Sequence, residues 1–302
     1  MSTSTALIQE RFSHIKNVIL VLSGKGGVGK STTSCQLALT LASLHPDQHI
    51  GILDVDICGP SVPGILGLTG CEIVQSTSNT TNTTTNNNNN IGWSPVQVPS
   101  APNVKCMSIG FLLKNKDDAV IWRGPKKNAM IRQFIEDVNW GDLDYLIIDT
   151  PPGTSDEHIT LCEILRDLSF IIAQEQQQHD PIVSSSIPIS TNIYAIIVTT
   201  PQQVSTVDVS REITFCRKLN IPIKGIIENM NGYVCPCCKE ITYIFGSGGG
   251  KKLCSEYNIQ YLGSIPIEPE LANAEDNGIN YIKNFANSVT ATQFESIVKN
   301  YL

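Results

Sequence analysis

Residues 20–31, Leu-Val-Leu-Ser-Gly-Lys-Gly-Gly-Val-Gly-Lys-Ser, predict the fold of this 302-residue chain. An apolar run ends at Ser23 and passes directly into the pattern G-x-x-x-x-G-K-S, after which residues 30–44 have a helical pattern. The glycines let successive backbone N–H groups point at one place, which the positive end of the helix dipole also faces. The alternative is a glycine-rich turn without a ligand. The order strand, loop, helix favours a phosphate-binding loop instead.

This loop supplies the groups that hold a nucleoside triphosphate and its Mg²⁺. Lys30 is placed to reach the β- and γ-phosphates, and the hydroxyl of Ser31 is placed to hold Mg²⁺. The candidate ATP-binding residues of the loop are Gly24, Lys25, Gly26, Gly27, Val28, Gly29, Lys30, Ser31 and Thr32.

The phosphate loop belongs to a longer series of short apolar runs and helical stretches. The runs predict strands at 17–22, 50–54, 145–149, 193–199 and 223–227, and shorter ones at 104–109 and 261–265. The helical patterns are at 30–44, 126–138, 155–168, 203–219 and 282–301. Runs that are apolar on both faces are typical of a buried parallel sheet. The sequence therefore predicts an α/β fold with a doubly wound, mainly parallel sheet.

Two polar segments interrupt this series. Residues 76–90 contain no apolar side chain, and residues 173–192 are rich in Gln, Ser and Pro. We interpret both as disordered insertions in a single ATPase domain that spans residues 1–302.

The composition excludes several classes of function. Hydrophobic residues make up 41% of the chain, enough for a globular core, and 21 Lys and Arg against 28 Asp and Glu leave a net charge of −7. This balance argues against broad binding to nucleic acid or anionic lipid. No apolar run is long enough to span a bilayer, and residues 1–17 lack a secretory or mitochondrial targeting pattern. We therefore expect a cytoplasmic protein without a nucleic-acid or membrane partner.

Three aspartates lie at the ends of two predicted strands. Asp54 and Asp56 follow the strand at 50–54, and Asp149 ends the strand at 145–149. An open α/β sheet binds its ligand at the carboxyl ends of its strands, so all three are candidates for the nucleotide site. Asp149 is the candidate Walker B carboxylate, in contact with Mg²⁺ directly or through water. For Asp54 and Asp56 the alternative is a helix N-cap or turn role.

Two groups stand out among the ten cysteines. Four lie in apolar periodic stretches and are predicted to be buried: Cys35, Cys106, Cys162 and Cys216. Cys235-Pro-Cys237-Cys238 instead contains a C-x-x-C pair, which can hold one edge of a metal site. A closed zinc or [4Fe–4S] site needs about four ligands, and the same pair from two subunits of a symmetric dimer supplies them. A zinc site of the same geometry, a redox C-x-x-C and unliganded thiols are the alternatives.

The phosphate loop resembles the deviant Walker A motif of the signature-lysine P-loop ATPases, which include the nitrogenase iron protein, MinD, ParA and Mrp-type proteins. The resemblance implies that Lys25 crosses a dimer interface to stabilise charge on the phosphates of the other subunit. A solvated loop lysine is the alternative. The same resemblance implies that Asp56 positions the attacking water and that Asp54 lies near the metal. The catalytic candidates are therefore Lys25, Lys30 and Asp56.

Several further blocks resemble the Mrp/NBP family of P-loop ATPases. They are residues 54–61 (DVDICGPS), 120–126 (VIWRGPK), 149–156 (DTPPGTSD), 199–202 (TTPQ) and 228–230 (ENM), the last leading into Cys-Pro-x-Cys. The resemblance runs from about residue 14 to the end, apart from the two insertions. Within the family it is to the shorter nucleotide-binding scaffold subunit of cytosolic iron–sulfur cluster assembly. The longer partner carries an N-terminal four-cysteine motif, whereas the 16 residues before the first predicted strand contain no cysteine.

This resemblance implies an ATP-binding, slowly hydrolysing scaffold that assembles a labile [4Fe–4S] cluster between subunits. Cys235 and Cys238 would be its ligands, and the cluster would pass to cytosolic and nuclear apo-proteins. The implied partners are the longer homologous subunit, in a heterotetramer, or a second copy of the chain, together with downstream targeting factors. Asn229 and a loop at residues 263–267 would frame the adenine. Ile241 stands where the family often has a third cysteine, and Cys237 is left without a role.

Two other classes of protein share parts of this pattern. A MinD- or ParA-like positioning ATPase, with a structural zinc at the dimer interface, would need a basic amphipathic helix or a basic face. Residues 280–302 contain only Lys283 and Lys299 as basic residues, which argues against it. An electron-transfer reductase like the nitrogenase iron protein takes its cluster ligands from two separated segments, whereas the pair here is contiguous.

Overall fold

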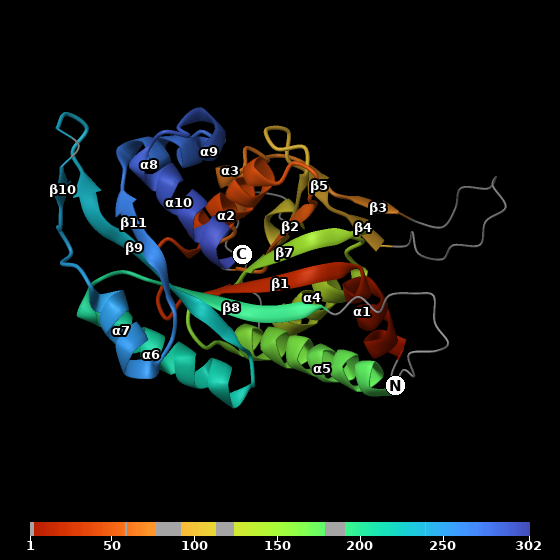
Figure 1. Ribbon diagram of the computed structural model, residues 1–302. Helices are drawn as coiled ribbons and strands as arrows, with labels where there is room; N and C mark the ends of the chain where they lie inside the picture. The colour runs from red at the N-terminus through yellow and green to blue at the C-terminus, as the bar shows by residue number, and fades with distance from the viewer. Residues whose placement is uncertain (1–2, 58, 77–91, 113–123, 179–190, 239) are drawn as a thin grey trace.

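The computed structural model describes residues 3–57, 59–76, 92–112, 124–178, 191–238 and 240–302 (Figure 1). The helices are α1 (Thr3–Ser13), α2 (Lys30–Leu44), α3 (Val62–Ile65), the 3₁₀ turn η2 (Ile109–Leu112), α4 (Gly124–Asp137), α5 (Asp156–Gln178), α6 (Gln203–Lys218), α7 (Gly249–Tyr257), α8 (Pro269–Asp276), α9 (Tyr281–Asn284) and α10 (Val289–Tyr301). The strands are β1 (Ile15–Leu22), β2 (Ile50–Asp54), β3 (Val74–Ser76), β4 (Gly92–Ser94), β5 (Val96–Gln97), β6 (Val104–Ser108), β7 (Leu143–Asp149), β8 (Asn192–Thr199), β9 (Ile223–Val234), β10 (Ile241–Thr242) and β11 (Tyr261–Ile267).

Nine of the described strands form one sheet, in the order β10-β9-β8-β1-β7-β2-β6-β5, with β11 also paired to β9. The pairs of β1, β2, β8 and β11 with their neighbours in this sheet are all parallel. Only the short end strands β10 and β5 run antiparallel to theirs. The prediction of a doubly wound, mainly parallel sheet is therefore confirmed.

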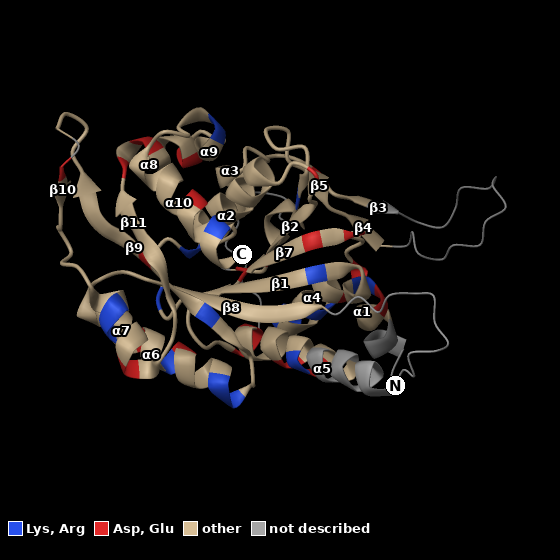
Figure 2. Ribbon diagram, in the orientation of Figure 1, with Lys and Arg blue, Asp and Glu red and all other residues tan. Residues whose placement is uncertain are grey.

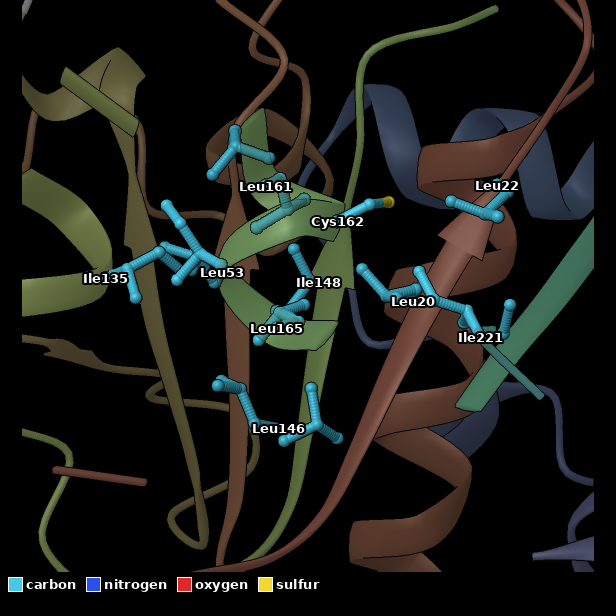
Figure 3. Packing of buried hydrophobic residues seen from close by; sticks show 14 of the residues in the cluster. Leu20, Leu22, Leu53, Ile135, Leu146, Ile148, Leu161, Cys162, Leu165 and Ile221 are labelled. Carbon is cyan, nitrogen blue, oxygen red and sulfur yellow. The ribbon is translucent and has the colours of Figure 1, made fainter. Parts of the chain in front are cut away.

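The central strand β1 is apolar on both faces because helices cover both sides of the sheet. Val18, Leu20 and Leu22 pack into one core cluster, while Ile19 and Val21 pack into another. Helices α1, α4, α5, α6 and α7 cover the first face, and α2, α3, α8, α9 and α10 cover the second (Figure 1). In the first cluster, side chains of β1 and β7 meet those of α5, including Leu161, Cys162 and Leu165 (Figure 3).

The topology places the phosphate loop at the carboxyl ends of the parallel strands. There the connection after β1 leads to one side of the sheet and the connection after β7 leads to the other. After β1 the chain forms α2 and returns in β2, but β7 lies between β1 and β2. In the register of these strands Val21 lies opposite Asp149, and Asp149 lies opposite Asp54. The three predicted strand ends therefore meet at one edge, which is where open α/β sheets bind ligands.

Most helix and strand predictions are confirmed, but the inserted segments begin later than predicted. Helix α5 continues to Gln178, so the insertion assigned to 173–192 is wrong at its start, and Asn192 already belongs to β8. The predicted helix at 155–168 is too short because Gln and Glu, which follow it, are good helix formers. Ser76 is the last residue of β3. The remaining parts, 77–90 and 179–190, lie outside the described residues, and a single domain over 1–302 stays a prediction.

The ends of the chain also differ from the prediction. Helix α1 was not predicted, yet Ile8 and Phe12, four residues apart on one side of it, are buried in the core. The helix predicted at 282–301 is two helices, α9 and α10. Each has its own N-cap: the side chain of Asn280 accepts from the backbone N–H of Lys283, and that of Ser288 accepts from Ala291. Among the described residues, no helix combines the length and hydropathy of a membrane span.

Candidate functional site

The phosphate loop leads from the end of β1 into the first turn of α2. Gly27 and Gly29 have φ values of +78° and +83°, a region that glycine adopts without strain. A Cβ at Gly29 would also overlap the side-chain amide of Asn229. Within the part of the chain that the structure describes, no side chain caps the N-terminus of α2. The first N–H groups of this helix are therefore available to an anion, as a phosphate site requires.

Asp149, at the end of β7, joins the cationic and hydroxyl groups of α2. Its carboxylate accepts hydrogen bonds from Lys30 Nζ at 2.8 Å, Ser31 Oγ at 2.6 Å and Ser34 Oγ at 2.8 Å. The side chains of Lys30 and Asp149 are only 6% and 0% exposed. The structure thus brings together the predicted phosphate lysine, the predicted Mg²⁺ hydroxyl and the predicted Walker B carboxylate.

Asp54 and Asp56 differ in environment although they are two residues apart. Asp54 is fully buried; its oxygens accept from Ser108 Oγ at 2.9 Å and from the backbone N–H of Asp56 at 3.1 Å. Burial, followed by the nearby charge of Asp149, raises the pKa of Asp54 to about 8. The bond to Asp56 is the local turn contact that was the alternative for Asp54. Asp56 itself is half-buried and lines the cleft beside the loop.

An open cleft of about 1640 Å³ runs along the phosphate loop. Loop residues from Lys25 to Thr32 line one wall, and Asp56 lies on the wall formed after β2. Lys25 is exposed. Glu275, near the end of α8, also lines this cleft, next to Thr32. Its carboxylate accepts from Thr32 Oγ1 at 2.8 Å and from Gln36 Nε2 at 3.1 Å.

Asn229, in β9, forms a hydrogen bond with the phosphate loop. Its side-chain amide donates to the carbonyl oxygen of Val28 at 2.8 Å, and the residue is only 5% exposed. Its expected contact with adenine stays a prediction. Residues 263–267, which were expected to form a loop around the adenine, belong to strand β11 instead, because they pair with β9.

The C-x-x-C pair lies in a hairpin between β9 and β10, which in Figure 1 extends beyond the main sheet. Val234 pairs with Ile241, and the backbone N–H of Cys235 donates to the carbonyl of Glu240 at 2.9 Å. Cys238 is exposed. The backbone N–H groups of Cys238 and then Cys237 hydrogen-bond to Cys235 and lower the pKa of its thiol. This hairpin therefore favours the thiolate, which is the metal-binding form of cysteine.

Five other cysteines of the described chain are buried and so unsuited to bind a metal at the surface. The four that were predicted to be buried are fully buried: Cys35, Cys106, Cys162 and Cys216. Burial raises the pKa of Cys216 to about 12 and that of Cys254 to about 11. Among the described residues, no three His, Cys, Asp or Glu side chains are placed to hold a metal ion together. One copy of the described chain thus offers only part of a closed metal site.

Four polar residues of this region were missed by the sequence prediction. They are Ser34, Ser108, Glu228 and Glu275. Ser34 lies one turn after Lys30, so helix periodicity could have placed it on the same face. Glu228 is fully buried and accepts from the backbone N–H groups of Gly248 and Gly250 at the start of α7. Ser108, Glu228 and Glu275 meet their partners only through the tertiary fold, so no local signal indicates these contacts, although Glu228 lies in the block 228–230 that carries the family resemblance.

A glycine loop between the central parallel strand and a helix, with a buried lysine paired to the carboxylate of the neighbouring strand, defines a P-loop NTPase. Residues 14–302 match the family model ParA, described as NUBPL iron-transfer P-loop NTPase. The chain belongs to this family, as the resemblance to Mrp/NBP proteins predicted.

Curated relatives match the chain over nearly its whole length. It is 50% identical over 287 residues to the cytosolic Fe-S cluster assembly factor NUBP2 homolog of Dictyostelium discoideum, covering 95% of this chain and 94% of that protein. It is 44% identical over 288 residues to cytosolic Fe-S cluster assembly factor NUBP2 of Bos taurus, covering 95% and 93%. These names agree with the expected assembly role and with the expected cytoplasmic location.

Solved structures agree with the fold. The nucleotide-binding protein of Archaeoglobus fulgidus in complex with ADP is 33% identical, with a TM-score of 0.69 and 91% of each chain covered. The septum site-determining protein MinD of Pyrococcus horikoshii, complexed with Mg-ADP, is 16% identical, with a TM-score of 0.61 and 94% of each chain covered. The likeness to MinD shows a shared fold and no more.

Proposed function

We propose that this chain is an ATP-binding scaffold of cytosolic iron–sulfur cluster assembly. It assembles a labile [4Fe–4S] cluster between two subunits and transfers it to cytosolic and nuclear apo-proteins. The observation that carries the proposal is that one strand, β9, serves both sites. Asn229 of β9 holds the phosphate loop through Val28, and the end of the same strand leads into Cys235. The names of the relatives support the assembly role.

The nucleotide site fits a Mg²⁺-bound triphosphate. The positive-φ glycines and the uncapped start of α2 supply N–H donors, and Lys30 supplies a buried positive charge for the β- and γ-phosphates. Ser31, already oriented by Asp149, would hold Mg²⁺, which neutralises phosphate charge during hydrolysis. Asp56 lines the cleft and would position the attacking water. We expect weak ATPase activity, because Lys25 would reach the phosphates only of the other subunit in a dimer and would leave the site of a single subunit incomplete.

The cysteine hairpin fits a cluster carried as cargo. Cys235 and Cys238 supply two of the four thiolates that a [4Fe–4S] cluster takes, so a second subunit must supply the others. The segment after the pair is apolar and exposed: Ile241, Tyr243, Ile244 and Phe245 are 42%, 55%, 58% and 38% exposed. Exposed apolar groups beside the cysteines are what a subunit contact would cover. The partner is the longer homologous subunit, in a heterotetramer, or a second copy of this chain.

The surface charge supports this proposal over a DNA- or membrane-positioning ATPase. In the view of Figure 2, Lys and Arg positions are spread over several helices, with Asp and Glu among them, rather than gathered on one face. With a net charge of −7, such a surface gives little attraction to phosphate backbones or anionic lipid.

Metal analysis of the anaerobically purified protein, with any partner that co-purifies, tests the proposed function. We expect iron and acid-labile sulfide in equal amounts, and transfer of both to an added apo-protein that accepts [4Fe–4S]. Stoichiometric zinc that persists after reconstitution with iron and sulfide, with neither retained, would instead indicate a zinc-clasped ATPase.

Lys25→Ala separates nucleotide binding from hydrolysis. Lys25 is exposed at the cleft, whereas Lys30 is buried against Asp149, so we expect Lys25→Ala to bind ATP nearly as well as wild type. Its ATPase rate should fall by about 10³-fold or more if the lysine stabilises phosphoryl charge in trans, the effect typical of a catalytic cation supplied across an interface. ATP turnover of the purified dimer is the measurement. A wild-type rate in Lys25→Ala would show that the lysine is only a solvated loop residue.

A further inference from the structure

Glu275 forms an acidic boundary of the phosphate-loop cleft on the side of α8. Its two carboxylate oxygens are held by Thr32 Oγ1 at 2.8 Å and by Gln36 Nε2 at 3.1 Å. Glu275 and Thr32 both line the cleft, and the carboxyl is half-buried rather than freely solvated. Two contacts from successive turns of α2 therefore fix this carboxylate beside the loop.

The direction of a bound triphosphate places its nucleoside near Glu275. The γ-phosphate end of a bound triphosphate would lie where Lys30 and Ser31 meet Asp149, at the end of β7. The hydroxyl of Thr32, the next residue, donates to Glu275 instead of Asp149. The loop cradles the α- and β-phosphates. A triphosphate with its γ-phosphate near Asp149 would therefore have its α-phosphate near Thr32. The ribose is joined to that phosphate through a single methylene group.

A carboxylate beside a polyphosphate is unfavourable unless the ligand also offers it hydrogen-bond donors. At neutral pH the phosphate oxygens act as acceptors, whereas the 2′- and 3′-hydroxyls of ribose are donors close to the α-phosphate. Acidic side chains accept from ribose hydroxyls in the same way in dinucleotide-binding folds. Each oxygen of Glu275 has a further lone pair beyond its bond to α2.

We propose that Glu275 accepts a hydrogen bond from a ribose hydroxyl of the bound nucleotide and so makes the site selective for ribonucleotides. This inference rests on the proposed binding of ATP at the phosphate loop. Glu275 is then a specificity-determining residue supplied by α8, a helix that contributes nothing to the phosphate-loop motif itself.

Equilibrium binding of Mg²⁺ with ATP, 2′-deoxy-ATP or 3′-deoxy-ATP to the full chain tests the proposal. We expect wild type to bind at least one deoxy analogue about tenfold or more weakly than ATP, the effect of losing a hydrogen bond to a charged group. In Glu275→Ala the affinity for ATP should fall to that of the deoxy analogue. The ratio of the Kd for the deoxy analogue to the Kd for ATP then approaches one. In Glu275→Gln the ratio should lie between these limits, because a neutral amide oxygen is a weaker acceptor.

The ratio between nucleotides distinguishes ribose recognition from a purely structural role. If Glu275 only positions Thr32, its removal weakens all three nucleotides by the same factor and the wild-type ratio persists, which would overturn the proposal. Wild type that binds ATP and both deoxy analogues equally would also overturn it. Asp276→Asn, which removes a neighbouring charge from the same cleft, is the matched control and should keep the wild-type ratio. Wild type that binds none of the three would overturn the proposed function, and this inference with it.

Discussion

Cys235→Ala or Cys238→Ala is expected to abolish stable [4Fe–4S] binding in the homodimer, with iron and sulfide falling to background after anaerobic reconstitution. Each substitution removes two of the four thiolates at once, because the same position is changed in both subunits. In Cys235→Ala the hairpin also loses the sulfur that accepts the backbone N–H groups of Cys238 and Cys237. The measurement is iron and acid-labile sulfide per polypeptide, compared with wild type treated in parallel.

Cys237→Ala is the matched control for these two variants. Cys237 lies within the same hairpin and is exposed, but the proposed pair does not include it. Cys237→Ala should therefore lower the iron and sulfide content less than the other two variants do. All three variants should bind ATP as wild type does, since the phosphate loop lies between β1 and α2. An intact cluster in Cys235→Ala would contradict the bridging geometry. Cys216 and Cys254 would then be the next candidates, although both are buried.

Lys30→Met is expected to weaken ATP binding on the order of 100-fold or more, because it removes the buried charge that faces the phosphates. The variant also leaves Asp149 buried without its cation, and breaking a buried pair costs about 3–5 kcal/mol. The free energy of unfolding should therefore fall as well, and binding must be measured well below the melting temperature.

A second variant separates these two effects of Lys30. Combining Lys30→Met with Asp149→Asn removes both charges while the amide oxygen can still accept from Ser31 or Ser34. The double variant should recover much of the lost stability and still fail to bind ATP. Near-wild-type affinity in either variant would mean that the phosphates are not held at Lys30. Lys25→Ala, in the same loop, is the control that should retain affinity.

The sequence predicts the centre of this site well because the relevant signals are local. The range of α2, Lys30–Leu44, agrees with the predicted 30–44, because the phosphate-loop motif is itself followed by a helix and the later Leu and Ala residues favour its continuation. The meeting of Lys30, Ser31 and Asp149 follows from parallel strands ending at one edge. The C-x-x-C pair is likewise read from spacing alone.

What the sequence misses depends on contacts between distant segments. Glu275 is 243 residues from Thr32, and no pattern near either residue indicates that they touch. The same holds for Ser108 and Asp54. The end of α5 was misplaced because the polar residues at 174–178 are as common in loops as in helices. Helix α1 was missed because its buried face is short, and tertiary packing of Ile8 and Phe12 stabilises it.

The central claim is that one cluster joins two subunits, and native mass spectrometry of the anaerobically reconstituted chain tests it most directly. The account predicts one [4Fe–4S] mass per dimer, four irons for two polypeptides, and dissociation to cluster-free monomers when an iron chelator removes the cluster. It also predicts that Cys238→Ala yields no cluster-bearing species. A complete [4Fe–4S] cluster on the mass of a single polypeptide would contradict the account.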